Sequence, residues 1–140
     1  MQVALRQALA ISLLALLPAG FSAFLHPKRP DFANQTREGE ITVEAALRNP
    51  ADYLWIDARP MPEHEAGHVP DSLPLNEDAW VNLLPAVLQA WPAGKPAIVY
   101  CDSRRCEVSH DVAKRLREVN LGPVFVLKGG WEAWQAAQKK

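Results

Sequence analysis

The sequence predicts an α/β domain with a central, mainly parallel sheet flanked by helices on both faces, preceded by an N-terminal hydrophobic helix. Short apolar runs rich in β-branched and aromatic residues alternate with segments of helical periodicity along most of the chain. Parallel strands need such crossovers, and their sheets are covered on both faces. The third observation is an uncharged apolar run at residues 8–25.

That run, "ALAISLLALLPAGFSAFL", would form a helix about 27 Å long, close to the hydrocarbon thickness of about 30 Å. A basic cluster, "HPKRP", follows it, and neither Gly20 nor Ala23 ends a good signal-peptidase site. A membrane anchor is therefore favoured over a cleaved secretory signal, and both interpretations stay open. We expect a single-pass N-terminal anchor, in a bacterial inner membrane, with the side of the soluble domain undetermined.

The chain divides into an anchor or signal-like segment at 1–25, a polar linker at 26–40 and a domain at 41–140. The domain is long enough to bury a core without cross-links, and the net charge of −1 disfavours a nucleic-acid surface. Two cysteines are too few for a disulfide-stapled scaffold.

No Lys or Arg lies between Arg59 and Lys95, a stretch that holds five acidic residues. We interpret these acidic residues as a solvated face.

In the first half of the domain, an extended start at Ile41 leads into a short helix that ends before Pro50. The run "YLWIDAR" is typical of a buried strand. Pro62 suits the first turn of a short helix, "PEHEAG", which Gly67 would end. "SLPLN" is a possible short strand.

In the second half, Pro85 interrupts the helical stretch "EDAWVNLLPAVLQAW" and predicts a bend or two shorter helices. "PAIVYC" and "GPVFVL" are strong strands. Between them, "CEVSHDVAKRLREVN" has apolar residues at helical spacing, namely Val108, Val112, Leu116 and Val119. "GGWEAWQAAQKK" predicts a closing helix with Trp131 and Trp134 on one face, after a tight turn at the two glycines.

Cys101 follows the most apolar strand, at the sheet edge where parallel α/β proteins collect ligands. A cysteine reacts as the thiolate, and its ordinary pKa is near 8.5. Lowering it by two units takes about 2.7 kcal/mol, whereas a helix start supplies about 2 kcal/mol at most. Inward-facing loop amides, or Arg104 and Arg105, must add the rest. The alternative interpretation is a small buried side chain that fills space.

Four landmarks in order resemble the rhodanese-like domain family, from about Ile41 to Trp134. They are "IDAR" at 56–59, "GHVPDS" at 67–72, the strand and cysteine at 99–101, and "LKGGWEAW" at 127–134. The resemblance implies a three-layer rhodanese-like domain whose cysteine carries a persulfide. Cys101 would take sulfur from a donor such as thiosulfate and pass it to a thiol or to cyanide, as a sulfurtransferase without cofactor or metal.

By the same resemblance, the loop after the nucleophile would bind the substrate, and in this chain it consists of Asp102, Ser103, Arg104, Arg105, Cys106 and Glu107. It lacks the usual glycine and is about two residues longer than the family's loop. A longer loop suggests a phosphatase, but Glu107 stands where phosphatases of this type have arginine, and its charge would repel phosphate. We therefore favour sulfur transfer.

Two further hypotheses stay open. The altered loop is compatible with a non-catalytic rhodanese-like binding module at the membrane. Alternatively, Cys106 could resolve a persulfide or sulfenic acid on Cys101, which would make the protein a thiol–disulfide redox partner. The sequence leaves the oligomeric state open.

Other polar residues have structural interpretations. We expect Asp57 and Arg59 to pin the loops around their strand end by hydrogen bonding. We expect His110 to lie on an exposed helical face, and Trp131 and Trp134 to serve in packing.

Overall fold

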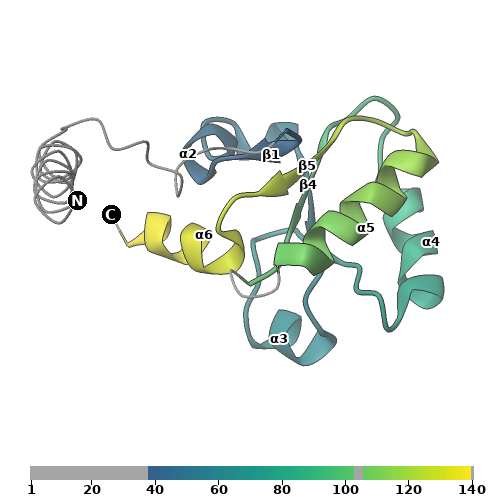
Figure 1. Cartoon of the computed structure of the whole chain (residues 1–140), viewed down its shortest axis with the longest axis horizontal. Helices are drawn as coiled ribbons and strands as arrows, with labels where there is room; N and C mark the ends of the chain where they lie inside the picture. The colour runs from purple at the N-terminus through teal and green to yellow at the C-terminus, as the bar shows by residue number, and fades with distance from the viewer. Residues whose placement is uncertain (1–37, 103–105, 140) are drawn as a thin grey trace, which may run out of the picture. The chain divides into compact units, whose positions relative to one another are not determined.

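The computed structural model describes residues 38–102 and 106–139 (Figure 1). The predicted anchor or signal segment at 1–25, and the linker as far as residue 37, lie outside the described residues. Within the described ranges, no helix has both the length and the apolar character needed to cross a membrane.

In the described part of the chain, five parallel strands form the sheet, in the order β1-β5-β4-β2-β3. Their bounds, in chain order, are β1 Glu40–Ile41, β2 Leu54–Asp57, β3 Leu73–Pro74, β4 Ala97–Tyr100 and β5 Val124–Leu127. The central strand, β4, is buried at every position, as expected for an apolar run covered on both faces. The predicted parallel sheet is confirmed.

Helices cover both faces of this sheet (Figure 1). Their bounds are α2 Val43–Ala46, α3 Met61–Ala66, α4 Trp80–Ala90, α5 Cys106–Val119 and α6 Gly130–Gln138, with a 3-10 turn η2 at Pro50–Asp52. Helices α4 and α5 bury their apolar sides against one face, and α2 and α6 bury theirs against the other. The three-layer α/β architecture is thus confirmed.

Alternate residues of the strands supply the two cores. In β4, Ala97 and Val99 face the core under α4 and α5, whereas Ile98 and Tyr100 face the core under α2 and α6. On α5, Val112 and Leu116 are fully buried, which confirms the amphipathic helix predicted from their spacing.

The alternative of two shorter helices at Pro85 is wrong, because α4 runs from Trp80 to Ala90 as one helix with the proline inside it. Pro85 has no N–H to donate to the carbonyl of Val81, four residues earlier. Val81 is 81% exposed, so water can bind that carbonyl. The helix tolerates the proline where the lost hydrogen bond faces solvent.

A tight turn joins β5 to α6 beside the end of β4. Gly129 and Gly130 have φ values of 75° and 55°, which confirms the predicted turn. A Cβ at Gly130 would clash with the carbonyl oxygen of Cys101, so only glycine fits there. The N–H of Trp131 donates to that same oxygen at 2.7 Å. The start of α6 is therefore docked on the residue that follows β4.

Candidate active site

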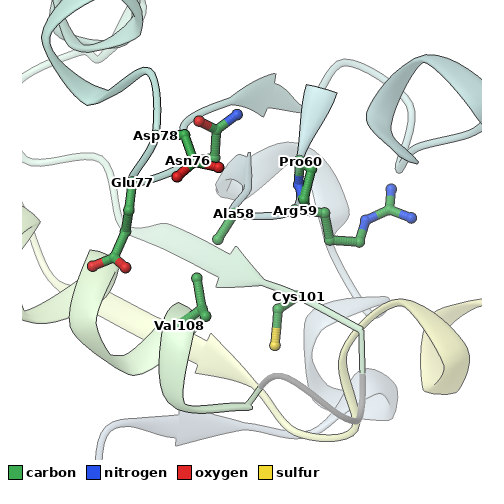
Figure 2. A pocket seen from close by; sticks show the side chains of 8 residues that line it. All are labelled: Ala58, Arg59, Pro60, Asn76, Glu77, Asp78, Cys101 and Val108. Carbon is green, nitrogen blue, oxygen red and sulfur yellow. The ribbon is translucent and has the colours of Figure 1, made fainter. Parts of the chain in front are cut away.

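A pocket of about 140 Å³ lies where the carboxyl ends of β2, β3 and β4 meet the start of α5 (Figure 2). Its lining residues are Ala58, Arg59, Pro60, Asn76, Glu77, Asp78, Cys101 and Val108. Cys101 thus lies where the parallel sheet predicts a ligand.

Cys101 lines the pocket as a buried residue that is only 2% exposed. Its thiol lies 2.9 Å from the carbonyl oxygen of Asp102 and 3.3 Å from Oγ of Ser109, and it can donate to either. A thiolate has no proton to donate, but the hydroxyl of Ser109 can rotate and donate its own proton to the sulfur. Ser109 is therefore placed to stabilise an anionic sulfur at Cys101.

Sequence reasoning missed Ser109. It is 1% exposed and shares a face of α5 with Val112 and Leu116, three and seven residues later. A hydroxyl residue in an otherwise apolar stripe is the signal that could have found it, since a buried hydroxyl needs a partner.

Beside the pocket, Asp57 is fully buried, and its carboxylate accepts five hydrogen bonds. The backbone N–H and Nε of Arg59 donate to its Oδ1, both at 3.0 Å. Its Oδ2 accepts from Nη2 of Arg59 at 2.7 Å, from Tyr100 at 2.9 Å and from Nδ1 of His64 at 3.0 Å. Because Asp57 ends β2 and Tyr100 ends β4, this network ties the two strand ends together.

The charged forms of Asp57 and Arg59 stabilise each other. Burial alone would raise the pKa of Asp57, but the hydrogen bonds from Arg59 and His64 outweigh it and hold that pKa below its ordinary value. Burial would lower the pKa of Arg59, and the paired carboxylate instead raises it. Burial raises the pKa of Tyr100, with the charge of Asp57 adding to the effect, so its hydroxyl stays protonated.

Arg59 and Tyr100 also have partners other than Asp57. Nη2 of Arg59 donates to the carbonyl of Gly67 at 2.7 Å. Its guanidinium lies 4.6 Å from the ring centre of Trp131 and points away from Cys101 (Figure 2). The Tyr100 hydroxyl accepts from the N–H of Val69 at 3.1 Å. The prediction that Asp57 and Arg59 pin the surrounding loops is confirmed.

The predicted packing role of the two tryptophans is confirmed as well. The rings of Trp131 and Trp134 stack with their centres 5.0 Å apart, and both pack on the core under α2 and α6.

The predicted loop is described only in part. Asp102 lies next to Cys101 and is half-buried, and Glu107 is exposed in the first turn of α5. Cys106 begins that helix. Ser103, Arg104 and Arg105 lie outside the described residues, and so does the predicted cradle of loop amides.

The expectation for His110 is wrong, because this residue is half-buried. Its Nε2 is buried and lies 3.3 Å from Oε1 of Glu40, at the edge strand β1. The helix packs this ring toward the sheet edge, which the spacing within α5 did not indicate.

The rim of the pocket also differs from the sequence interpretation. Glu77 and Asp78, which we interpreted as part of a solvated face, are exposed yet line the pocket that holds Cys101. The signal that could have found them is their place in the segment that follows β3, at the carboxyl ends of the strands where ligands bind.

Comparisons with known proteins agree with this architecture. A family model for the rhodanese-like domain matches residues 42–137. No curated protein sequence matches the chain.

Among solved structures, a rhodanese-related protein from Thermoplasma volcanium is 18% identical with a TM-score of 0.57, over 70% of this chain and 91% of its own. A thiosulfate sulfurtransferase from Pseudomonas aeruginosa is 19% identical with a TM-score of 0.60, over 75% of this chain but 19% of its own. A Rhodopseudomonas palustris protein described as a possible tyrosine phosphatase is 22% identical with a TM-score of 0.53, over 71% of this chain and 80% of its own. At such identities these likenesses show the fold. With its family model matched over most of its length, the chain belongs to the rhodanese-like domain family.

Proposed function

We propose that the protein is a sulfurtransferase that carries sulfane sulfur as a persulfide on Cys101. The observation that carries this proposal is a cysteine at the carboxyl end of the central strand, lining a pocket in a rhodanese-like domain.

In the first step, the Cys101 thiolate attacks the outer sulfur of a donor such as thiosulfate. A bond forms between Sγ and that sulfur, and the sulfur–sulfur bond of the donor breaks. Its electron pair leaves with sulfite, which balances the charge. In the second step, an acceptor thiolate attacks the outer sulfur of the persulfide and takes it, and Cys101 becomes a thiolate again.

The residues around Cys101 support this chemistry. The hydroxyl of Ser109 can donate to the thiolate and to the inner sulfur of the persulfide. The N–H of Trp131 holds the carbonyl of Cys101, and the Asp57–Tyr100 hydrogen bond holds the residue before it. The nucleophile is thereby positioned by rigid elements on both sides.

Intact-mass measurement of the full chain after thiosulfate or polysulfide tests the proposal. We expect one added sulfur atom, mapped to Cys101, and none in Cys101→Ala. Cys106→Ala is the matched control and should still take up sulfur. A wild-type chain that stays unmodified with every sulfane donor would overturn the proposal in favour of a binding module. A reversible bridge between the two cysteines, without added sulfur, would favour the redox hypothesis.

We also propose that residues 8–25 anchor the protein in a membrane. The support is the uncharged run and the basic cluster after it. We expect the full chain to sediment with membranes and to resist alkaline carbonate, and Leu14→Lys with Leu16→Lys to weaken this retention. Recovery of the intact, unprocessed wild-type chain in the carbonate-soluble fraction would rule the anchor out.

A further inference from the structure

We propose that Glu77 and Asp78 bias the choice of sulfur acceptor at the Cys101 pocket by charge: their carboxylates raise the rate with thiols that carry a cationic substituent relative to neutral thiols, and the rate with neutral thiols relative to anionic ones. This inference rests on the proposed function, because it concerns the second step of sulfur transfer at the same pocket.

The charges on the described walls carry the inference. Three lining residues, Ala58, Pro60 and Val108, offer apolar side chains, and Asn76 offers a neutral amide. The guanidinium of Arg59 is paired with the buried carboxylate of Asp57 and points away from Cys101 (Figure 2). The unpaired charges among the described lining residues are therefore the two carboxylates.

These carboxylates stand on a fixed segment. The backbone N–H of Leu75 donates to the carbonyl of Asp57 at 2.8 Å, which continues the pairing of β3 with β2. Asn76 is 5% exposed, and its side-chain oxygen accepts from the N–H of Ala79 at 2.9 Å. Glu77 and Asp78 lie between these two hydrogen bonds, so the backbone that carries them is held beside the pocket.

An acceptor that enters the pocket comes close to these two carboxylates, because they line it. Its thiolate attacks the outer sulfur of the persulfide, the bond from that sulfur to Sγ breaks, and the electron pair returns to Sγ. The substituent of the acceptor thiol then lies near the rim. Its charge sets how strongly the two carboxylates raise or lower the rate of sulfur transfer to that acceptor.

The expected size follows from Coulomb's law with screening. For charges about 10 Å apart, two carboxylates change the relative rates of a +1 and a −1 substituent by about threefold at 0.1 M salt and by about 15-fold at low salt. Neutralising both carboxylates should remove this factor.

Three two-carbon thiols provide the test: cysteamine, 2-mercaptoethanol and 2-mercaptoethanesulfonate. The full chain is first loaded with sulfur from polysulfide, and the second-order rate of sulfur loss to each thiol is measured by mass. Comparing the cysteamine-to-sulfonate rate ratio between wild type and Glu77→Gln/Asp78→Asn cancels the intrinsic reactivities of the thiols. The matched control is Asp52→Asn/Glu118→Gln. It removes two exposed carboxylates near the amino ends of the strands, away from the pocket at their carboxyl ends.

We expect the ratio to fall about threefold at 0.1 M salt in the pocket variant, and more at low salt, with no change in the control. An unchanged ratio in the pocket variant, with the persulfide still formed, would overturn this inference and leave the proposed function standing. Equal falls in both variants would overturn it too, because the effect would then come from net charge. Failure of the wild-type chain to take up sulfur at all would instead refute the proposed function.

Discussion

At the scale of single residues, the sulfur of Cys101 has a hydroxyl 3.3 Å away on the first turns of α5. A hydrogen bond to a charged acceptor contributes about 1.5–3 kcal/mol, and 1.36 kcal/mol corresponds to one pKa unit. Ser109→Ala should therefore raise the pKa of the Cys101 thiol and slow its alkylation near neutral pH by about tenfold. The pH dependence of iodoacetamide labelling in the Cys106→Ala background measures this.

Ser109→Thr is the matched control, because it keeps the hydroxyl on the same helical turn. It should label at a rate closer to wild type than the alanine variant does. If the alanine variant kept the wild-type pH profile, Ser109 would have a packing role alone.

Also at this scale, Asp57→Asn should lower the free energy of unfolding by about 3–5 kcal/mol at pH 7, because Arg59 would keep a buried charge without its partner. The pKa of Asp57 is lower in the folded chain than in the unfolded chain, where it is near 3.9. The ionised carboxylate therefore stabilises the fold fully above about pH 3.9, and this stabilisation is lost as the pH falls through the folded pKa. Urea unfolding from pH 7 to pH 3 should show the gap between wild type and variant closing below about pH 4.

The exposed Asp52→Asn is the control for this series and should stay within about 0.5 kcal/mol of wild type throughout. A gap between wild type and Asp57→Asn that kept its full size down to pH 3 would contradict the assigned ionisation of Asp57.

At the scale of elements, the docking of α6 on the end of β4 depends on Gly130. Its positive φ costs an alanine about 1–2 kcal/mol, and the clash with the Cys101 carbonyl adds about 1–3 kcal/mol of overpacking. Gly130→Ala should thus lower the free energy of unfolding by about 2–5 kcal/mol in urea denaturation. It should also slow sulfur uptake, because the clash displaces the backbone of Cys101.

Gly94 offers the matched comparison, since its φ is +82° and a Cβ added there would meet nothing within 4 Å. Gly94→Ala should cost only about 1–2 kcal/mol and leave sulfur uptake unchanged. Equal effects of the two substitutions on stability and uptake would show that the contact between α6 and Cys101 contributes to neither.

At the scale of the whole molecule, the described residues of both hydrophobic cores come from positions 41–137. The family match covers nearly the same span, 42–137. A chain beginning at Glu38 should therefore unfold within about 1 kcal/mol of the full chain, because it keeps the buried apolar area that stabilises the domain. Thermal and urea unfolding of the two chains, in the same detergent, measures this.

Sulfur uptake by the shortened chain is the accompanying readout and should match that of the full chain. A loss of several kcal/mol on removing residues 1–37 would show that this segment completes the domain.

The sequence by itself determined the alternating α/β order, the strands β2, β4 and β5, the amphipathic character of α5 and the position of Cys101 after the central strand. These features depend on periodicity and apolar content within short windows, which neighbouring residues fully specify. The four family landmarks likewise are local motifs in a fixed order. The alternative of two shorter helices at Pro85 was wrong, because the cost of the lost hydrogen bond depends on the solvent exposure of Val81, and exposure depends on how the helix packs.

Only the tertiary structure decided which side chains meet. It joined Asp57 to Tyr100 across 43 residues, brought Ser109 to the sulfur of Cys101 and placed Glu77 and Asp78 on the rim of the same pocket. These contacts arise where the parallel register and the packing of α5 bring distant segments together. Asp57 and Tyr100 lie too far apart for one local window, and so do the two carboxylates and Cys101. The contact between Cys101 and Ser109 depends on how α5 packs, so all of these meetings are properties of the fold.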